Sequence, residues 1–108
     1  MTYEKGFIAL ADPTRRTVFE RLRTGPKSAG ALAEGLPMTR QAVAKHLAVL
    51  EAAELVATER DGRCKRHYLN PMPLAKMARR WLGRFEDVPL AAMAGFHGAP
   101  GAVQVART

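Results

Sequence analysis

The stretch LAEGLPMTRQAVAKHLAVL at residues 32–50 decides how this chain folds. It reads as two helices around a tight turn that contains Gly35 and Pro37. Thr39 is suited to cap the second helix, because its hydroxyl can accept a hydrogen bond from an otherwise unpaired amide of the first turn. In that helix the apolar residues at helical spacing, which are expected to face inward, are Val43, Leu47 and Leu50.

The outer face of this second helix carries side chains suited to DNA, namely Arg40, Gln41, Ala44, Lys45 and Ala48. Arginine and glutamine can pair with base edges in a major groove, lysine can hold a phosphate, and alanine lets the helix lie close. The spacing from Ala33 through Pro37 to Val43 is typical of a helix-turn-helix. A plain two-helix hairpin would show the same apolar spacing, so this stretch alone leaves both interpretations open.

The composition favours one small domain that binds a polyanion. The chain has 108 residues, a net charge of +7 and one cysteine, Cys64. A strongly basic balance attracts nucleic acid, although a merely soluble basic protein would share it. A single cysteine excludes an internal disulfide and fits a reducing cytosol. With no apolar signal core after Met1 and no run of membrane-spanning length, we expect a cytoplasmic protein without a membrane partner.

The remaining pattern predicts a mainly α-helical fold with one β-hairpin. Short helices are expected near residues 3–11, from Pro13 to the Gly25-Pro26 break, and from the Ser28 cap to Gly35, ahead of the helix from Arg40 to about Ala53. A hairpin follows, with strands at 56–60 and 63–69 around an Asp61-Gly62 turn. A last long helix carries an apolar stripe from Leu74 to Phe85. This order is that of a winged helix-turn-helix.

The chain after Phe85 loses this regularity. Pro89 interrupts the pattern and residues 97–101 are rich in helix breakers, so residues 90–96 are expected to be helical at best. We therefore divide the chain into a winged helix-turn-helix DNA-binding and dimerisation domain at 1–85 and a poorly patterned tail at 86–108.

The predicted hairpin is basic around its tip, where Arg60, Arg63, Lys65 and Arg66 gather. A basic hairpin beside a reading helix can follow the DNA backbone or enter a minor groove. The alternative is a solvated hairpin whose charges protect an exposed strand edge from aggregation. Cys64 lies among these cations, which would favour its thiolate and make a redox switch conceivable. The interpretation of Cys64 as an incidental small residue on a strand is favoured, because the chain offers no partner cysteine.

Several motifs together resemble the ArsR family of small homodimeric bacterial repressors. They are Leu10 to Arg16, Lys45 to Leu50, Leu55-Val56, and Arg60 to Arg63 continuing to Tyr68-Leu69, and the resemblance covers roughly residues 7–85. It implies a dimer interface made by the first and last helices, here Phe7, Leu10, Leu74, Met77, Trp81 and Phe85. It implies DNA contacts from the start of the reading helix and from the wing, which with the other wing cations gives Thr39, Arg40, Gln41, Ala44, Lys45, Arg60, Arg63 and Lys65. Many members have serine where this chain has Ala44.

The metal-sensing branches of the family have features that this sequence lacks. One branch carries two or more cysteines on the helix before the turn, and residues 28–33 contain none. Another binds zinc through Asp and His on the last helix, and residues 74–85 contain no His, Asp or Glu. We therefore expect no metal and no cofactor. The tail from Glu86 also departs from the family, whose last helix usually continues amphipathically.

Individual residues allow structural interpretations beside functional ones. Trp81 and Phe85 could stack on bases, but their spacing with Leu74 and Met77 favours a buried dimer seam. His46 is expected to pack between helices and His67 to lie at the surface. Arg15 and Arg16 could reach phosphate, or one could pair with a nearby carboxylate, Asp12 or Glu20.

The sequence predicts a homodimeric repressor and excludes an enzyme. There is no Gly-rich phosphate loop and no cluster of catalytic acids, histidines or nucleophiles. Two reading helices would enter successive major grooves of a partly palindromic operator and block the promoter. The alternative is a winged-helix adaptor for protein or RNA, which would be expected to have lost the basic residues of the helix and wing.

Overall fold

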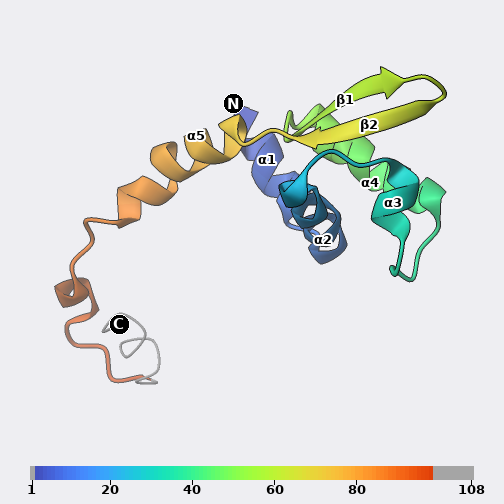
Figure 1. Cartoon of the computed structure of the whole chain (residues 1–108). Helices are drawn as coiled ribbons and strands as arrows, with labels where there is room; N and C mark the ends of the chain where they lie inside the picture. The colour runs from blue at the N-terminus through green and yellow to red at the C-terminus, as the bar shows by residue number, and fades with distance from the viewer. Residues whose placement is uncertain (1, 99–108) are drawn as a thin grey trace.

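The computed structural model describes residues 2–98 and shows a helical body with one hairpin (Figure 1). In chain order the elements are α1 (Thr2–Leu10), α2 (Pro13–Glu20), the 3-10 turn η1 (Arg21–Thr24), α3 (Ala29–Ala33), α4 (Arg40–Ala52), β1 (Val56–Asp61), β2 (Cys64–Leu69), α5 (Met72–Arg80), η2 (Leu82–Phe85) and η3 (Leu90–Met93). This confirms the mainly α-helical fold with a two-stranded hairpin. Within residues 2–98 no helix has the length and apolarity needed to cross a membrane.

Three helices begin where short polar side chains cap them, as the sequence predicts. The Asp12 carboxylate accepts from the amides of Thr14 and Arg15 at 2.8 and 3.2 Å, with Pro13 at the first position of α2. The Ser28 hydroxyl caps α3 and the Thr39 hydroxyl caps α4, at 3.2 and 3.1 Å from the amides they accept. Each cap satisfies a donor that the helix itself leaves unpaired.

Arginine side chains satisfy carbonyl groups at the ends of α1 and α3. Arg15 Nε donates to the Ala9 carbonyl at 2.7 Å, and Arg16 Nη1 donates to the Leu10 carbonyl at 2.7 Å. Arg15 also lies 3.8 Å from the Asp12 carboxylate, which confirms the structural alternative for one of the two arginines. Arg21 Nη1 contacts the carbonyls of Leu32 and Glu34 at 3.2 and 2.5 Å and so closes α3 in the same way.

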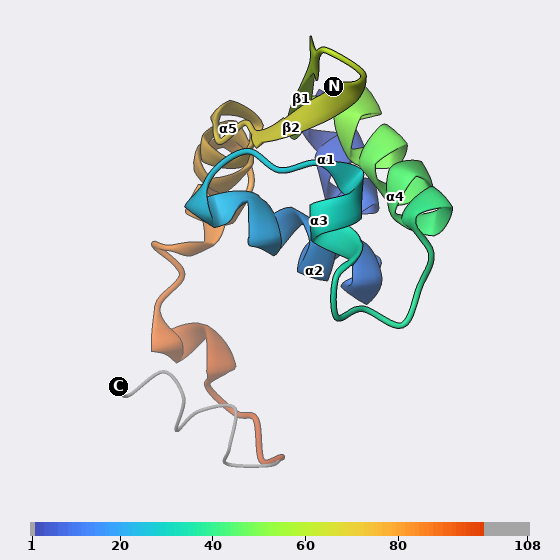
Figure 2. The same cartoon turned by 45° about the vertical axis from the view of Figure 1, so that its right-hand side comes forward.

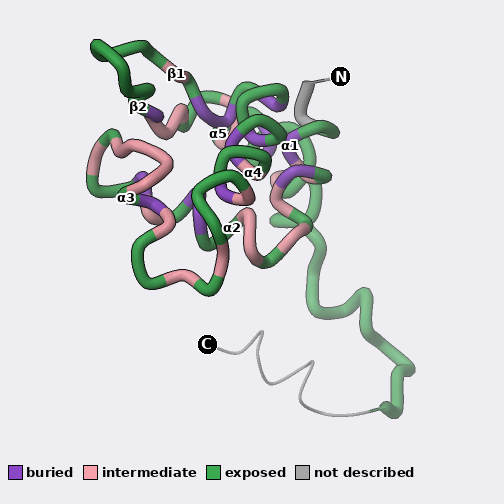
Figure 3. The backbone as a smooth tube through the Cα atoms, turned by 90° about the vertical axis from the view of Figure 1, so that its right-hand side faces the viewer, coloured by how far each residue is buried: buried purple, intermediate pink, exposed green. Residues whose placement is uncertain are grey.

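The core lies where α2, α3 and α4 meet and continues under β1. The predicted inward residues of α4 are buried, and they pack with Val18, Phe19, Leu22, Leu32, Leu55 and Val56. Burial of each such aliphatic side chain stabilises the fold by about 1.5–3 kcal/mol. Figure 3 shows the opposite pattern for the hairpin tip and the segment after α5, which are exposed. The core therefore fixes how α4 and the hairpin sit.

The hairpin is antiparallel and its turn lies one residue later than the sequence suggested. The register runs from Val56 opposite Leu69 to Asp61 opposite Cys64, so Gly62 and Arg63 form the turn. Gly62 has φ +66°, a conformation that glycine adopts without strain, whereas Asp61 continues the strand. A glycine at the first central position matches the second favoured type of hairpin turn, which needs positive φ only there.

His67 is buried, so the expectation of a surface residue is wrong. Its side chain is 7% exposed, and Nδ1 lies 3.1 Å from the Thr58 hydroxyl on β1. Its backbone pairs with Lys27 through two hydrogen bonds of 2.9 and 3.1 Å, which joins the segment before α3 to β2. The expectation rested on the alternation of His67 with Tyr68 along one strand and did not include the pairing of His67 with the distant Lys27.

The last helix is shorter than its apolar stripe predicts. α5 ends at Arg80, and residues 82–85 continue as the 3-10 turn η2. α1 packs against α5 closely, since a Cβ placed on Gly6 would come within 2.8 Å of the Met77 sulfur. Figure 2 shows α5 and the following segment leaving the helical body. Of the predicted tail, residues 86–98 are exposed and include η3, while residues 99–108 lie outside the described part.

Candidate nucleic-acid interface

The outer face of α4 is exposed to solvent in the first half of the helix, where the sequence predicts DNA contacts. Arg40, Gln41, Ala44 and Lys45 are exposed, and Thr39 caps the helix immediately before them. The residues on the opposite face are buried in the core. α4 thus has one anchored face and one presented face, which is the geometry that a helix needs to enter a DNA groove.

A groove of about 400 Å³ lies between α3, α4 and the hairpin. Its cations are Arg40 on α4, Arg63 in the turn and Lys65 on β2, and the small residues Ala29, Gly30, Ala44 and Ala48 also line it. The structure therefore brings four of the predicted DNA residues, Arg40, Ala44, Arg63 and Lys65, to one groove. The other four, Thr39, Gln41, Lys45 and Arg60, are exposed beside it and do not line it.

The cations of this surface are not engaged within the chain. Among residues 2–98, no side-chain hydrogen bond or ion pair involves Arg40, Lys45, Arg60, Arg63 or Lys65. Arg66 differs, because its guanidinium lies 2.8 Å from the Asp61 carboxylate across the hairpin. Unpaired exposed cations bind phosphates without first giving up an internal partner.

Several groove residues were not assigned there by sequence reasoning, among them Gly30, Glu51 and His67. Gly30 looked like an ordinary small residue of a short helix, and Glu51 follows the last predicted inward residue. Burial lowers the pKa of His67, which the Glu51 carboxylate opposes and Lys65 reinforces. Knowledge of the hairpin register was the missing signal, since only the register places His67 beside Thr58.

A second surface, made by α1, α5 and η2, is apolar. Trp81 contacts Phe7 and Phe85 edge to face, with ring centroids 5.5 and 5.0 Å apart. Of the six predicted interface residues, Trp81 and Phe85 are exposed, Phe7, Leu10 and Leu74 are half-buried, and Met77 is covered by its own chain. Ile8, Met72 and Leu82 are exposed apolar neighbours that the prediction did not include.

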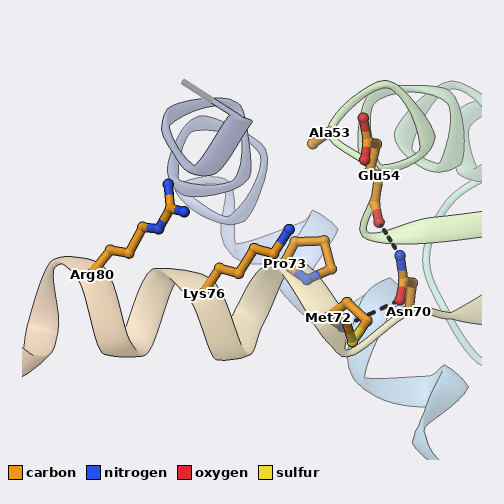
Figure 4. Close-up of a pocket in the computed structure, with 7 residues that line it drawn as sticks. All are labelled: Ala53, Glu54, Asn70, Met72, Pro73, Lys76 and Arg80. Atoms are coloured by element: carbon orange, nitrogen blue, oxygen red, sulfur yellow. Dashed lines mark hydrogen bonds between the residues drawn. The ribbon is translucent and has the colours of Figure 1, made fainter.

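The small cavity beside α5 is too narrow for an organic ligand. It holds about 70 Å³ and is lined by Ala53, Glu54, Asn70, Met72, Pro73, Lys76 and Arg80 (Figure 4). Ligand pockets are roughly 300–1,000 Å³. Asn70 uses its side chain locally, because Nδ2 donates to the Glu54 carbonyl at 2.8 Å and Oδ1 accepts from the Met72 amide at 3.2 Å. Within residues 2–98 no group of three or more His, Cys, Asp and Glu could hold a metal ion.

The chain is similar to known transcriptional regulators over most of its length. A family described as a helix-turn-helix domain matches residues 10–59. The HTH-type transcriptional regulator Rv2034 of Mycobacterium tuberculosis is 44% identical over 82 residues, which are 76% of each chain. The transcriptional repressor SdpR of Bacillus subtilis is 34% identical over 64 residues, which are 59% of this chain and 71% of SdpR.

Solved structures agree with these relatives. An ArsR-like transcriptional regulator from Rhodococcus sp. RHA1 is 38% identical, with a TM-score of 0.69 over 85% of this chain and 89% of that one. The relatives are regulators of transcription, which confirms the expectation that the chain is not an enzyme. The chain belongs to the ArsR family of winged helix-turn-helix transcriptional regulators, with a helix-turn-helix that binds DNA.

Proposed function

We propose that this regulator is a homodimeric repressor that occludes a promoter by binding a partly palindromic operator. The observation that carries the proposal is the groove between α4 and the hairpin, which joins the presented face of α4 to unpaired wing cations. Repression is favoured over activation because SdpR, one of its relatives, is a transcriptional repressor. A bound dimer would block the promoter without a further partner.

Within this proposal α4 reads bases through Gln41, while the cations of α4 and of the wing hold the backbone. Gln41 lies in the first turn of α4, where its amide can pair with both polar atoms of an adenine edge. Arg40 and Lys45 flank it, Thr39 fixes the helix start, and Ala44 allows close approach. Arg60, Arg63 and Lys65 would contact phosphates, which carry affinity and not sequence information.

The dimer would form through α1, α5 and η2. Support comes from the exposed apolar side chains there, including Ile8 and Phe85, which are 68% and 55% exposed. Apolar surface of this extent is favourable to bury against a second copy, and a twofold interface would pair the same patch on both subunits. Two α4 helices about 34–36 Å apart would match one turn of DNA.

The proposal predicts that Gln41 contributes to sequence specificity, whereas Arg63 contributes to affinity for any DNA. Genome-wide co-precipitation recovers the bound DNA, and footprinting then identifies the operator. The binding of each variant is measured on operator and on random DNA across a salt series. Gln41→Ala should cost roughly 1–3 kcal/mol on the operator and almost nothing on random DNA. Arg63→Ala should weaken both and lower the salt slope by about one unit per subunit.

The matched control is Arg23→Ala, which removes an exposed arginine that does not line the groove. It should leave the operator affinity and the salt slope near those of the wild type. A Gln41→Ala variant that loses affinity equally on both DNAs, or a footprint without symmetric half-sites, would contradict the proposal.

A further inference from the structure

Gly30 has no backbone reason to be glycine. It is the second residue of α3, between Ala29 and Ala31, and it is absent from the glycines that have positive φ, which are Gly25, Gly35, Gly62 and Gly95. Alanine at this position would adopt the same helical conformation and would favour the helix. The glycine therefore calls for an explanation in its surroundings.

The space above Gly30 is filled by the guanidinium of Arg40. A Cβ built on Gly30 would lie 3.2, 3.3 and 3.4 Å from Arg40 Nη2, Nε and Cζ, and these are its three nearest atoms. The Nε and Nη2 atoms at one edge of the guanidinium are therefore the atoms nearest to the position of the absent side chain, with Cζ slightly farther away. Arg40 and Gly30 both line the groove between α4 and the hairpin.

Contact alone holds the guanidinium in this place. The Arg40 side chain forms no hydrogen bond or ion pair within residues 2–98, so its guanidinium N–H groups have no partner in this part of the chain. Arg63 and Lys65 line the same groove from the hairpin side. A site with cations contributed from two sides suits a phosphate oxygen, which arginine can bind with two parallel hydrogen bonds.

We propose that Gly30 is a positioning residue for DNA binding. Its missing side chain provides a flat seat on α3 that holds the Arg40 guanidinium in the groove, where it binds a backbone phosphate of the DNA. This inference rests on the proposed DNA contact of Arg40 and adds the residue that orients it. A methyl group at position 30 would displace the guanidinium by a few tenths of an ångström and so disturb its position in the groove, although the fold would keep its stability.

The test is a double-mutant cycle of Gly30→Ala and Arg40→Ala, read as affinity for operator and random DNA over a salt series. Arg40→Ala should weaken both DNAs by about tenfold, the worth of one hydrogen bond to a charged group, and lower the salt slope. Gly30→Ala should weaken binding to both DNAs several-fold, which is less than the loss in Arg40→Ala, and should lower the salt slope by a smaller amount. In the Arg40→Ala background it should cause no further loss.

Two measurements separate positioning from damage to the fold. The unfolding temperature of Gly30→Ala should equal or exceed that of the wild type. The Arg40 Nε–H signal in the NMR spectrum of the free protein should shift in Gly30→Ala and stay in place in the control Ala31→Ser, which adds an atom at the exposed neighbour.

Three outcomes would overturn the inference. Gly30→Ala could bind as the wild type does, it could lose affinity equally with and without Arg40, or it could leave the Arg40 signal unchanged. If the wild type binds its operator, each of these outcomes contradicts the positioning role of Gly30. A wild type that binds no DNA would instead overturn the proposed function, and the role of the seat with it.

Discussion

His67 is the buried polar side chain of the described residues, and it sits where the wing joins the body. Thr58 contacts its Nδ1 from β1, while Glu51 on α4 and Lys65 on β2 are the charges that act on it. Because burial disfavours the charged imidazole, it lowers the pKa of His67 below the ordinary 6.5. The fold therefore prefers the neutral ring.

This preference predicts a pH-dependent stability. Well above pH 6.5 the His67 ring is neutral in both the folded and the unfolded chain, so it does not make the free energy of unfolding depend on pH. As the pH falls below 6.5 the unfolded chain binds the proton first, so the free energy of unfolding should decrease. Urea unfolding between pH 7.5 and 5.5 should show this decrease in the wild type and a smaller one in His67→Gln.

The control replaces His97, which is exposed, with glutamine. His97→Gln should keep the wild-type dependence. If His67→Gln loses as much stability between pH 7.5 and 5.5 as the wild type does, the buried imidazole is not its source.

Among the elements, those specified by neighbouring residues were predicted and those specified across the chain were not. Asp12, Ser28 and Thr39 cap the helices that the sequence assigned to them, because a cap involves only the next three residues. The hairpin turn depends on how all of β1 pairs with β2, and α5 packs against α1 from the other end of the described chain. For the same reason Arg40 was predicted as an outward-facing side chain, while its seat on α3 could be found only from the fold.

The end of α4 carries a strained residue that no sequence signal marked. Glu54 has φ +64°, the left-handed region, and is the only non-glycine residue there within residues 2–98. The Glu54 amide donates to the Glu51 carbonyl at 2.9 Å, and the Leu55 amide donates to the Leu50 carbonyl at 3.0 Å. These two bonds form the helix ending that usually has glycine at this place.

Replacing this residue by glycine should therefore stabilise the protein. Glu54→Gly should raise the free energy of unfolding by about 1 kcal/mol, because a side chain is strained in the left-handed region and glycine is not. The same substitution three residues earlier is the control: Glu51→Gly lies within α4 and should lower stability by about 1 kcal/mol. Urea midpoints measure both, and a destabilised Glu54→Gly would refute the strain argument.

At the scale of the whole molecule, the charged and apolar surfaces lie at different places. The groove cations sit on α4 and the hairpin. Most exposed large apolar side chains lie instead on α1, on α5 and η2, and on the segment from Val88 to Phe96, which leads away from the body in Figure 1. A protein of net charge +7 needs no such apolar surface to bind DNA. Because the apolar surface is separate from the groove, a second copy of the chain could bind there while the grooves of both subunits face the DNA.

The last prediction tests whether Trp81 belongs to that second interface. Trp81 is 40% exposed and links Phe7 to Phe85. An aspartate there would bury a charge in the dimer seam, at a cost of several kcal/mol, so Trp81→Asp should sediment as a monomer at micromolar concentration. A monomer engages one half-site only, so operator binding should fall below detection while helical circular dichroism is retained. The exposed neighbour variant Arg79→Asp should remain dimeric. A wild type that sediments as a monomer, or a dimeric Trp81→Asp, would refute this interface.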